Sequence, residues 1–239
     1  MVNRNPDGAE RRVVPVHSAK DIERIAERTL AQFDPESLQV ARPTALEAIL
    51  IGTGTNFATR DIGYAANGRK ILGNFIPPDI ITIDSSIAGS VRFTFSLGHE
   101  LGHRILHEKI RPEDVGDAFT DQVDPRTLRP QLLTNKDWAE WQANRFAQAI
   151  VMPRATARDA VVEIQAQMGI SRGRRGRVYV GWERESRRDF KRLIHALADR
   201  YNTTPTTAEY RLATLGILTD GRDRKGLRHV TDLRPSREK

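Results

Sequence analysis

The chain has 239 residues, a formal net charge of +7 at pH 7 and no cysteine. Without cysteine, disulfides, thiolate zinc sites and cysteine nucleophiles are excluded, which fits a cytoplasmic protein. The chain opens with no basic-then-apolar signal and contains no apolar run of membrane-spanning length, so we expect neither secretion nor a membrane anchor.

The positive charge comes mainly from arginine. A basic surface can attract nucleic acid or an acidic protein partner. Arginine-rich proteins encoded by GC-rich genomes are, however, often basic without binding any polyanion, and we favour this explanation here. A nucleic-acid partner is therefore the less favoured interpretation.

The first predicted elements are two helices. Ser18 and Asp21 have the spacing of a capping box, and apolar residues at helical spacing follow them until Pro35. A shorter helix is predicted after Pro43, and Gly52 ends it.

A small sheet is predicted next. Segments 62–65 and 69–76 flank Asn67-Gly68, the dipeptide most typical of a tight hairpin. A β-branched segment, 79–84, follows. We expect a three-stranded antiparallel or mixed sheet that backs the following helix.

That helix, predicted over residues 91–107, contains an H-E-x-x-H motif formed by His99, Glu100 and His103. Residues four apart lie on the same face of a helix, so the two imidazoles can point at one metal ion. Glu100 lies next to them and can hold a metal-bound water, as a zinc peptidase requires. A chance match on an ordinary amphipathic helix is the alternative, and the rest of the chain has to decide.

Beyond the motif, segment 108–136 is rich in proline and acidic residues and predicts a long loop, with one short helix at most, beside a substrate cleft. Helices are predicted over 137–153 and 154–170. The basic, glycine-rich segment 171–177 reads as a linker in preference to a phosphate contact. Segment 187–218 predicts two helices that resemble a helix-turn-helix, although a plain helical hairpin packed on the core is slightly favoured.

The third metal ligand is the next question, because a catalytic zinc normally takes three protein ligands. His17 and His229 lie in predicted flexible ends, and His107 lies too far along the motif helix, so we expect it to pack or to support a ligand. Glu140 is the best candidate. Asn144, one turn later, can accept a hydrogen bond from a ligand histidine. Spacing alone does not separate ligation from an ordinary surface position for Glu140.

Two longer stretches carry a family resemblance. Residues 93–107 read FTFSLGHELGHRILH, residues 140–147 read EWQANRFA, and Val151-Met152-Pro153 follows. They resemble the ImmA/IrrE family of metallopeptidases, whose members share an rFtlaHElgHllLH stretch followed by an ExxANxFAxxLLMP stretch. Residues 210–217, YRLATLGI, are similar to that family's terminal RLxxLGL.

The resemblance implies a zinc peptidase with His99, His103 and Glu140 as metal ligands and Glu100 as the general base. It implies a mostly helical, zincin-like α+β fold, with a small three-stranded sheet beside the motif helix and helix-turn-helix-like helices at the C-terminal end. Members of the family typically act in the cytoplasm, where they cleave a helix-turn-helix repressor and so derepress mobile-element or stress-response genes. The longer acidic connection and the lack of an obvious C-terminal sensor domain leave the substrate and the trigger open.

We accordingly expect four parts: a disordered tail (1–13), a zinc metallopeptidase domain (14–155), a helical module with the basic loop (156–219) and a second disordered tail (220–239). The sequence does not indicate an oligomeric state.

Two alternatives to a protease remain. The chain could be a non-catalytic regulatory module that binds a repressor, although pure binding would not need Glu100. It could also bind DNA through the C-terminal helices. For the protease, Tyr179, His195 and Tyr201 are candidate oxyanion donors, and the sequence does not choose among them.

Overall fold

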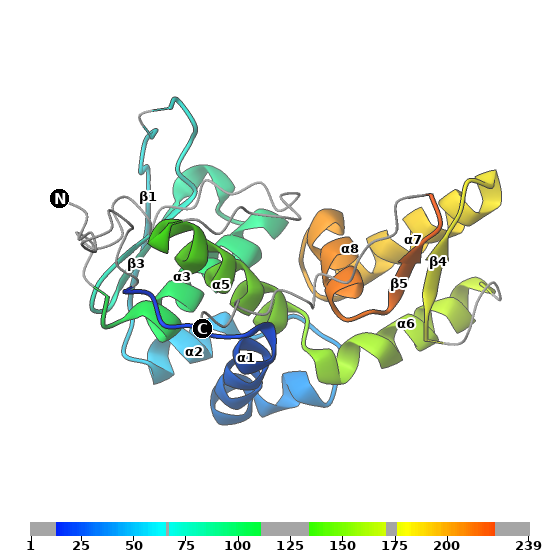
Figure 1. Ribbon diagram of the computed structural model, residues 1–239, viewed down its shortest axis with the longest axis horizontal. Helices are drawn as coiled ribbons and strands as arrows, with labels where there is room; N and C mark the ends of the chain where they lie inside the picture. The colour runs from blue at the N-terminus through cyan, green and yellow to red at the C-terminus, as the bar shows by residue number, and fades with distance from the viewer. Residues whose placement is uncertain (1–12, 66, 111–133, 171–175, 223–239) are drawn as a thin grey trace, which may run out of the picture.

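The computed structural model describes residues 13–65, 67–110, 134–170 and 176–222. The two predicted tails, most of the acidic segment and most of the basic loop therefore lie outside the described residues, apart from Val13, the edges of the two loops and residues 220–222. Within the described part, one group of helices packs with a three-stranded sheet, and a second group packs with a two-stranded sheet (Figure 1).

The first two helices are confirmed. Helix α1 spans Ala19–Phe33, and Ser18 and Asp21 form the reciprocal hydrogen bonds of a capping box at its start. Helix α2 spans Leu46–Gly52. Between them, the short 3₁₀ helix η1 (Pro35–Leu38) leads into a turn.

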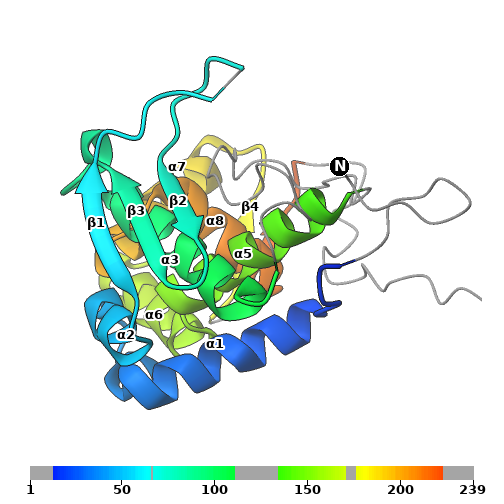
Figure 2. The ribbon, with the colours of Figure 1, turned by 90° about the vertical axis from the view of Figure 1, so that its left-hand side faces the viewer.

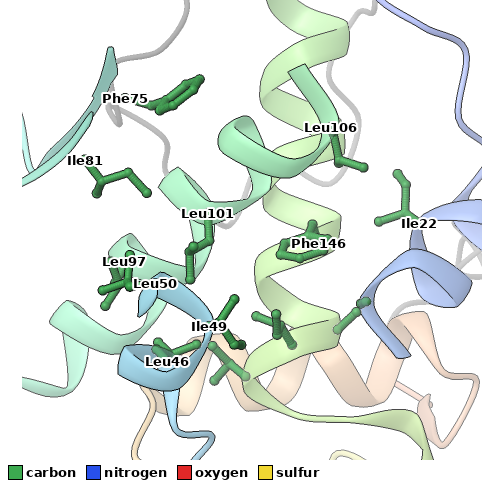
Figure 3. Packing of buried hydrophobic residues seen from close by; sticks show 14 of the residues in the cluster. Ile22, Leu46, Ile49, Leu50, Phe75, Ile81, Leu97, Leu101, Leu106 and Phe146 are labelled. Carbon is green, nitrogen blue, oxygen red and sulfur yellow. The ribbon is translucent and has the colours of Figure 1, made fainter. Parts of the chain in front are cut away.

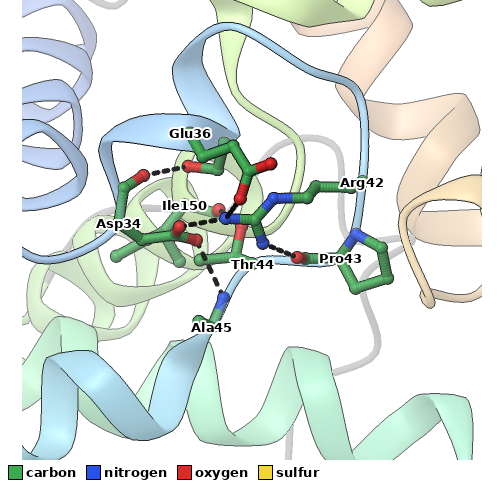
Figure 4. Close-up of polar contacts among 8 residues, drawn as sticks. Asp34, Glu36, Arg42, Pro43, Thr44, Ala45 and Ile150 are labelled. Atoms are coloured by element: carbon green, nitrogen blue, oxygen red, sulfur yellow. Dashed lines mark hydrogen bonds and ion pairs between the residues drawn. The ribbon is translucent and has the colours of Figure 1, made fainter.

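That turn is tied to the end of helix α5 (Asn135–Val151). The carboxylate of Asp34 forms an ion pair with Arg42 and accepts a hydrogen bond from the backbone N–H of Ala45 at 2.9 Å. Thr44 then donates its hydroxyl to the carbonyl of Ile150 at 2.7 Å (Figure 4). The connection from α1 to α2 is therefore held against the helix that carries Glu140.

The predicted three-stranded sheet is confirmed as a mixed sheet with the order β1-β3-β2. Strand β1 (Asn56–Arg60) runs parallel to β3 (Ile80–Asp84), and β2 (Gly73–Ile76) runs antiparallel to it (Figure 2). The predicted first strand at 62–65 is wrong, since only one bridge, between Tyr64 and Lys70, forms there.

The error has a physical reason. All five residues of β1 are exposed, so the segment lacks the alternation that marks a half-buried strand. The Asn67-Gly68 turn is present, and residues 63–65 and 69–71 beside it are joined by backbone hydrogen bonds and the one bridge, but strands β1 and β2 each pair with β3.

Helix α3 (Val91–His107) carries the motif and packs along α5, and this is the most extensive contact between two helices among the described elements. The two backbones approach closely because small residues face each other. A Cβ added at Gly102 would lie 3.0 Å from the Cα of Ala143, and one added at Gly98 would lie 3.5 Å from the Cα of Ala147.

One hydrophobic core surrounds this helix pair. Figure 3 shows side chains from α1, α2, the sheet, α3 and α5 meeting in it: Ile22, Ile49, Phe75, Leu101 and Phe146 are all at most 1% exposed. The sheet and α1 therefore hold α3 and α5 from two sides.

The C-terminal elements build a second core. Helices α6 (Arg154–Met168), α7 (Arg184–Arg200) and α8 (Pro205–Thr214) were predicted, and they pack around Leu197, Tyr201 and Leu212. The strands β4 (Val178–Val180) and β5 (Leu218–Asp220), which pair in parallel, were not predicted because three residues are too few to show a period. None of the described helices is long and apolar enough to cross a membrane.

Candidate metal centre

The sheet determines where the motif helix begins. Asp84, the last residue of β3, accepts hydrogen bonds from the backbone N–H of Ile62 at 2.8 Å and of Ser86 at 2.9 Å. The second bond caps the short 3₁₀ helix η2 (Ser85–Ile87), which leads directly into α3. Lys70 lies 3.2 Å from the same carboxylate, so a buried charge is compensated at this junction.

The motif helix and α5 bring three metal-binding side chains together. Nε2 of His99 lies 3.0 Å from Nε2 of His103. The carboxylate oxygens of Glu140 lie 3.3 Å from Nε2 of His99 and 3.5 Å from Nε2 of His103. Both histidines are fully buried, and only 12% of the Glu140 side chain is exposed.

This donor set fits zinc. Ligand atoms at the corners of a tetrahedral zinc site, with bonds of about 2.0–2.1 Å, are separated by roughly 3.3 Å. The separations of 3.0, 3.3 and 3.5 Å among the three donors agree with that spacing. Two imidazole nitrogens and one carboxylate, with one position left for water, are the ligand set of a catalytic zinc.

Glu140 is ionised in this setting. Burial by itself favours the neutral carboxyl, but the adjacent His103 and His99 outweigh it and lower the pKa of Glu140 to about 2. A carboxylate at this position supplies negative charge to the cluster throughout the neutral pH range.

Glu100 points from the same helix toward the sheet. Its side chain is fully buried and lies against β2, where a Cβ added at Gly73 would come within 2.5 Å of Oε1. A side chain at this position would displace the carboxylate from where it lies. The first residue of β2 and the motif glutamate thus lie against one another.

Each metal-binding histidine has a partner on its other ring nitrogen. Nδ1 of His99 lies 3.2 Å from Oδ1 of Asn144, one helical turn after Glu140. Nδ1 of His103 lies 3.0 Å from Nδ1 of His107. Each ring therefore presents Nε2 to the cluster, which is how outer partners orient metal ligands.

His107 has a second contact of its own. Its Nε2 lies 3.0 Å from Oε1 of Gln142, and the amide nitrogen of Gln142 donates to the carbonyl of Pro15 at 2.7 Å. Burial, followed by the neighbouring His103, lowers the pKa of His107 to about 3, so this ring is neutral. The sequence placed His107 outside the ligand set, and in the structure it contacts His103.

The oxyanion candidates from the sequence do not converge on this centre. The hydroxyl of Tyr201 donates to Thr156 at 3.1 Å inside the second core. Tyr179 lies on β4 and is 47% exposed, and His195 is exposed on α7.

Sequence reasoning also missed Gly73 and Gln142. Gln142 follows Glu140 by two residues, and residues two apart do not lie on the same face of a helix. Gly73 lies in a different element from Glu100, so no spacing within one element could have related them.

Comparison with known families decides the class of the domain. Residues 67–168 match the family model Peptidase_M78, the IrrE N-terminal-like domain. This domain is an ImmA/IrrE-type metallopeptidase. The matched residues include the sheet strands β2 and β3, helix α3 and helix α5, and hence the complete cluster of His99, His103 and Glu140. No curated protein matches the chain.

The ImmA/IrrE-type domain makes the chain a zinc metallopeptidase with the predicted α+β fold. The match ends at residue 168, within α6, so it extends 13 residues past the boundary expected at 155 (168 − 155). A peptidase of this class acts on a protein substrate.

Proposed function

We propose that the chain is a cytoplasmic zinc endopeptidase in which His99, His103 and Glu140 hold the metal and Glu100 is the general base. The observation that carries this proposal is the convergence of three donor atoms from two helices within 4.8 Å, with Glu100 next to His99 on the motif helix. Asn144 orients His99 through the contact at 3.2 Å.

The chain's own residues suggest how hydrolysis proceeds. When bound, zinc supplies Lewis acidity, which lowers the pKa of a coordinated water and polarises the scissile carbonyl. Glu100 takes the proton of the attacking water on its carboxylate and then transfers it to the leaving amine. The carboxylate is buried and lies against β2.

The proposed substrate is a helix-turn-helix transcriptional repressor, and its cleavage would derepress mobile-element or stress-response genes. The resemblance to the ImmA/IrrE family supports this assignment. We also propose that residues 14–155 form the peptidase domain and 156–219 a helical second module. Two separate hydrophobic cores, which meet between Val151 and Met152, support this division.

The test uses the full chain, zinc and the purified repressor encoded next to its gene. Wild-type protein should produce repressor fragments that mass spectrometry identifies, and Glu100→Gln should bind the repressor without cutting it. Cleavage by Glu100→Gln at the wild-type rate would refute the role of Glu100. Binding without cleavage by the wild type would favour the non-catalytic regulatory module instead.

DNA binding through the C-terminal helices is the remaining alternative. A gel shift of DNA by the full chain that weakens as salt rises would support it, whereas no shift at low salt would remove it.

A further inference from the structure

A path of hydrogen-bonding groups leads from the metal centre to the N-terminal segment. It begins at Nδ1 of His103, passes through both ring nitrogens of His107 and both amide atoms of Gln142, and ends at the carbonyl of Pro15. The three separations along it are 3.0, 3.0 and 2.7 Å. His103, His107 and Gln142 are all fully buried.

The end of the path sets its direction. A backbone carbonyl only accepts hydrogen bonds, so Gln142 must turn its NH₂ group toward Pro15 and its Oε1 toward His107. Oε1 also only accepts, so the proton of His107 lies on Nε2. A neutral imidazole carries one N–H, so the Nδ1 atom of His107 is an acceptor.

The same logic reaches the metal ligand. Because Nδ1 of His107 accepts, Nδ1 of His103 must carry the proton and donate it. A neutral imidazole carries one proton, so Nε2 of His103 is left with its lone pair facing Glu140 and His99. That is the tautomer that can bind a metal ion.

We propose that His107 and Gln142 are positioning residues that hold His103 in its metal-binding tautomer, and that the segment around Pro15 is part of the metal centre. This inference rests on the proposed ligation of zinc by His103. The N-terminal segment is itself held in place, since the backbone N–H groups of Val13 and Val14 donate to Oδ1 of Asn135 at 2.9 and 3.3 Å. Asn135 and Gln142 lie on the same helix, so α5 holds the segment at two points.

The two ligand histidines are thus oriented by different means. Nδ1 of His99 contacts the amide of Asn144, on the helix that also carries Glu140. His103 depends on two intermediate side chains and on a backbone atom 127 residues away from Gln142. Loss of one intermediate side chain should therefore affect His103 and leave His99 in place.

The decisive experiment compares Gln142→Met with Gln148→Met in the full chain. Both glutamines are buried on α5, and both substitutions make the same change in side-chain chemistry. Gln142 is one of the groups that form the path from His103 to Pro15, and Gln148 is not. Zinc affinity is measured by competition with a chromophoric chelator. We expect Gln142→Met to weaken zinc binding by about 10- to 100-fold and Gln148→Met to leave it unchanged. Equal affinities for the two variants would overturn the inference.

A second measurement does not depend on a variant that folds. Long-range ¹H–¹⁵N spectra of the zinc-free wild type report the tautomer of each histidine ring. We expect protons on Nδ1 of His103 and on Nε2 of His107, and a proton on Nε2 of His103 would overturn the inference. A wild type that binds zinc but cleaves no repressor would refute the proposed substrate and leave this inference standing.

Discussion

The guanidinium of Arg211 on α8 forms an ion pair with the carboxylate of Glu23 on α1, 188 residues earlier in the chain, through two nitrogen–oxygen contacts. Nε of Arg211 also donates to the carbonyl of Met152 at 2.8 Å, where α5 ends. Only 2% of this side chain is exposed. The C-terminal helices are thereby attached to the same two helices, α1 and α5, that support the metal centre.

Replacing Arg211 should destabilise the whole chain. Arg211→Met leaves the carboxylate of Glu23 without its partner in a largely buried position, and such losses typically cost about 3–5 kcal/mol. Urea unfolding measures the change in the free energy of unfolding. The control is Arg200→Met, because Arg200 pairs with a Glu163 side chain that is 60% exposed, and an exposed pair contributes at most about 1 kcal/mol. Similar losses in the two variants would show that the Arg211 pair does not join the two cores.

Substituting Gly73 should separate catalysis from zinc binding. The Cβ in Gly73→Ala would overlap Oε1 of Glu100 and push the carboxylate aside, whereas the three metal-binding side chains lie on other elements. We expect peptidase activity to fall by about 100-fold or more, the usual contribution of a positioned general base, with zinc content unchanged. Gly181→Ala is the control, because the nearest atoms to its Cβ belong to the exposed side chains of Glu183 and Tyr179, away from the metal centre's helices. Full activity of Gly73→Ala would mean that Glu100 is not held at this position.

The close packing of α3 on α5 predicts unequal effects of two glycine substitutions. Gly102→Ala adds a Cβ only 3.0 Å from the backbone of Ala143, which cannot move without shifting α5. Overpacking of this kind costs about 1–3 kcal/mol, more than the roughly 1 kcal/mol that alanine gains over glycine in a helix. Gly98→Ala meets its neighbours at 3.3 Å and beyond and should be tolerated better. Thermal unfolding and zinc titration of both variants test this order, and a Gly98→Ala that loses more than Gly102→Ala would contradict it.

Zinc should stabilise the folded protein through Glu140. A ligand that binds only the folded state adds about 4 kcal/mol at a thousandfold excess over its dissociation constant. The melting temperature should therefore rise with zinc and fall on addition of a chelator. In Glu140→Ala, which removes the carboxylate of the cluster, the rise should be much smaller. An unchanged rise would exclude Glu140 from the ligand set.

The sequence predicted those features that depend on local pattern. The capping box at Ser18, the i to i+4 pair His99 and His103, and the helices on either side of Pro153 all follow from spacing within one element. The choice of Glu140 as a candidate also came from spacing, helped by the family resemblance. The structure brings it to within 3.5 Å of both histidines.

What the sequence did not predict depends on contacts between distant segments. Strand β1 forms because it pairs with β3, and its exposed residues show no alternation that could announce it. The contact between Gly73 and Glu100, and that between Gln142 and Pro15, join elements whose relative position only the packed core determines. In the described part of the chain, the elements were largely predictable and the pairings between them were not.

The group that accepts the hydrogen bond from Gln142 belongs to the main chain. Every residue type carries such a carbonyl, so no substitution at position 15 can delete this acceptor, and only a shift of the backbone can remove it. An alanine scan would therefore report position 15 as silent, and an alignment would show no constraint on its side chain. The dependence of the metal centre on the N-terminal segment would instead appear as sensitivity to insertions, deletions or fusions placed just before α1.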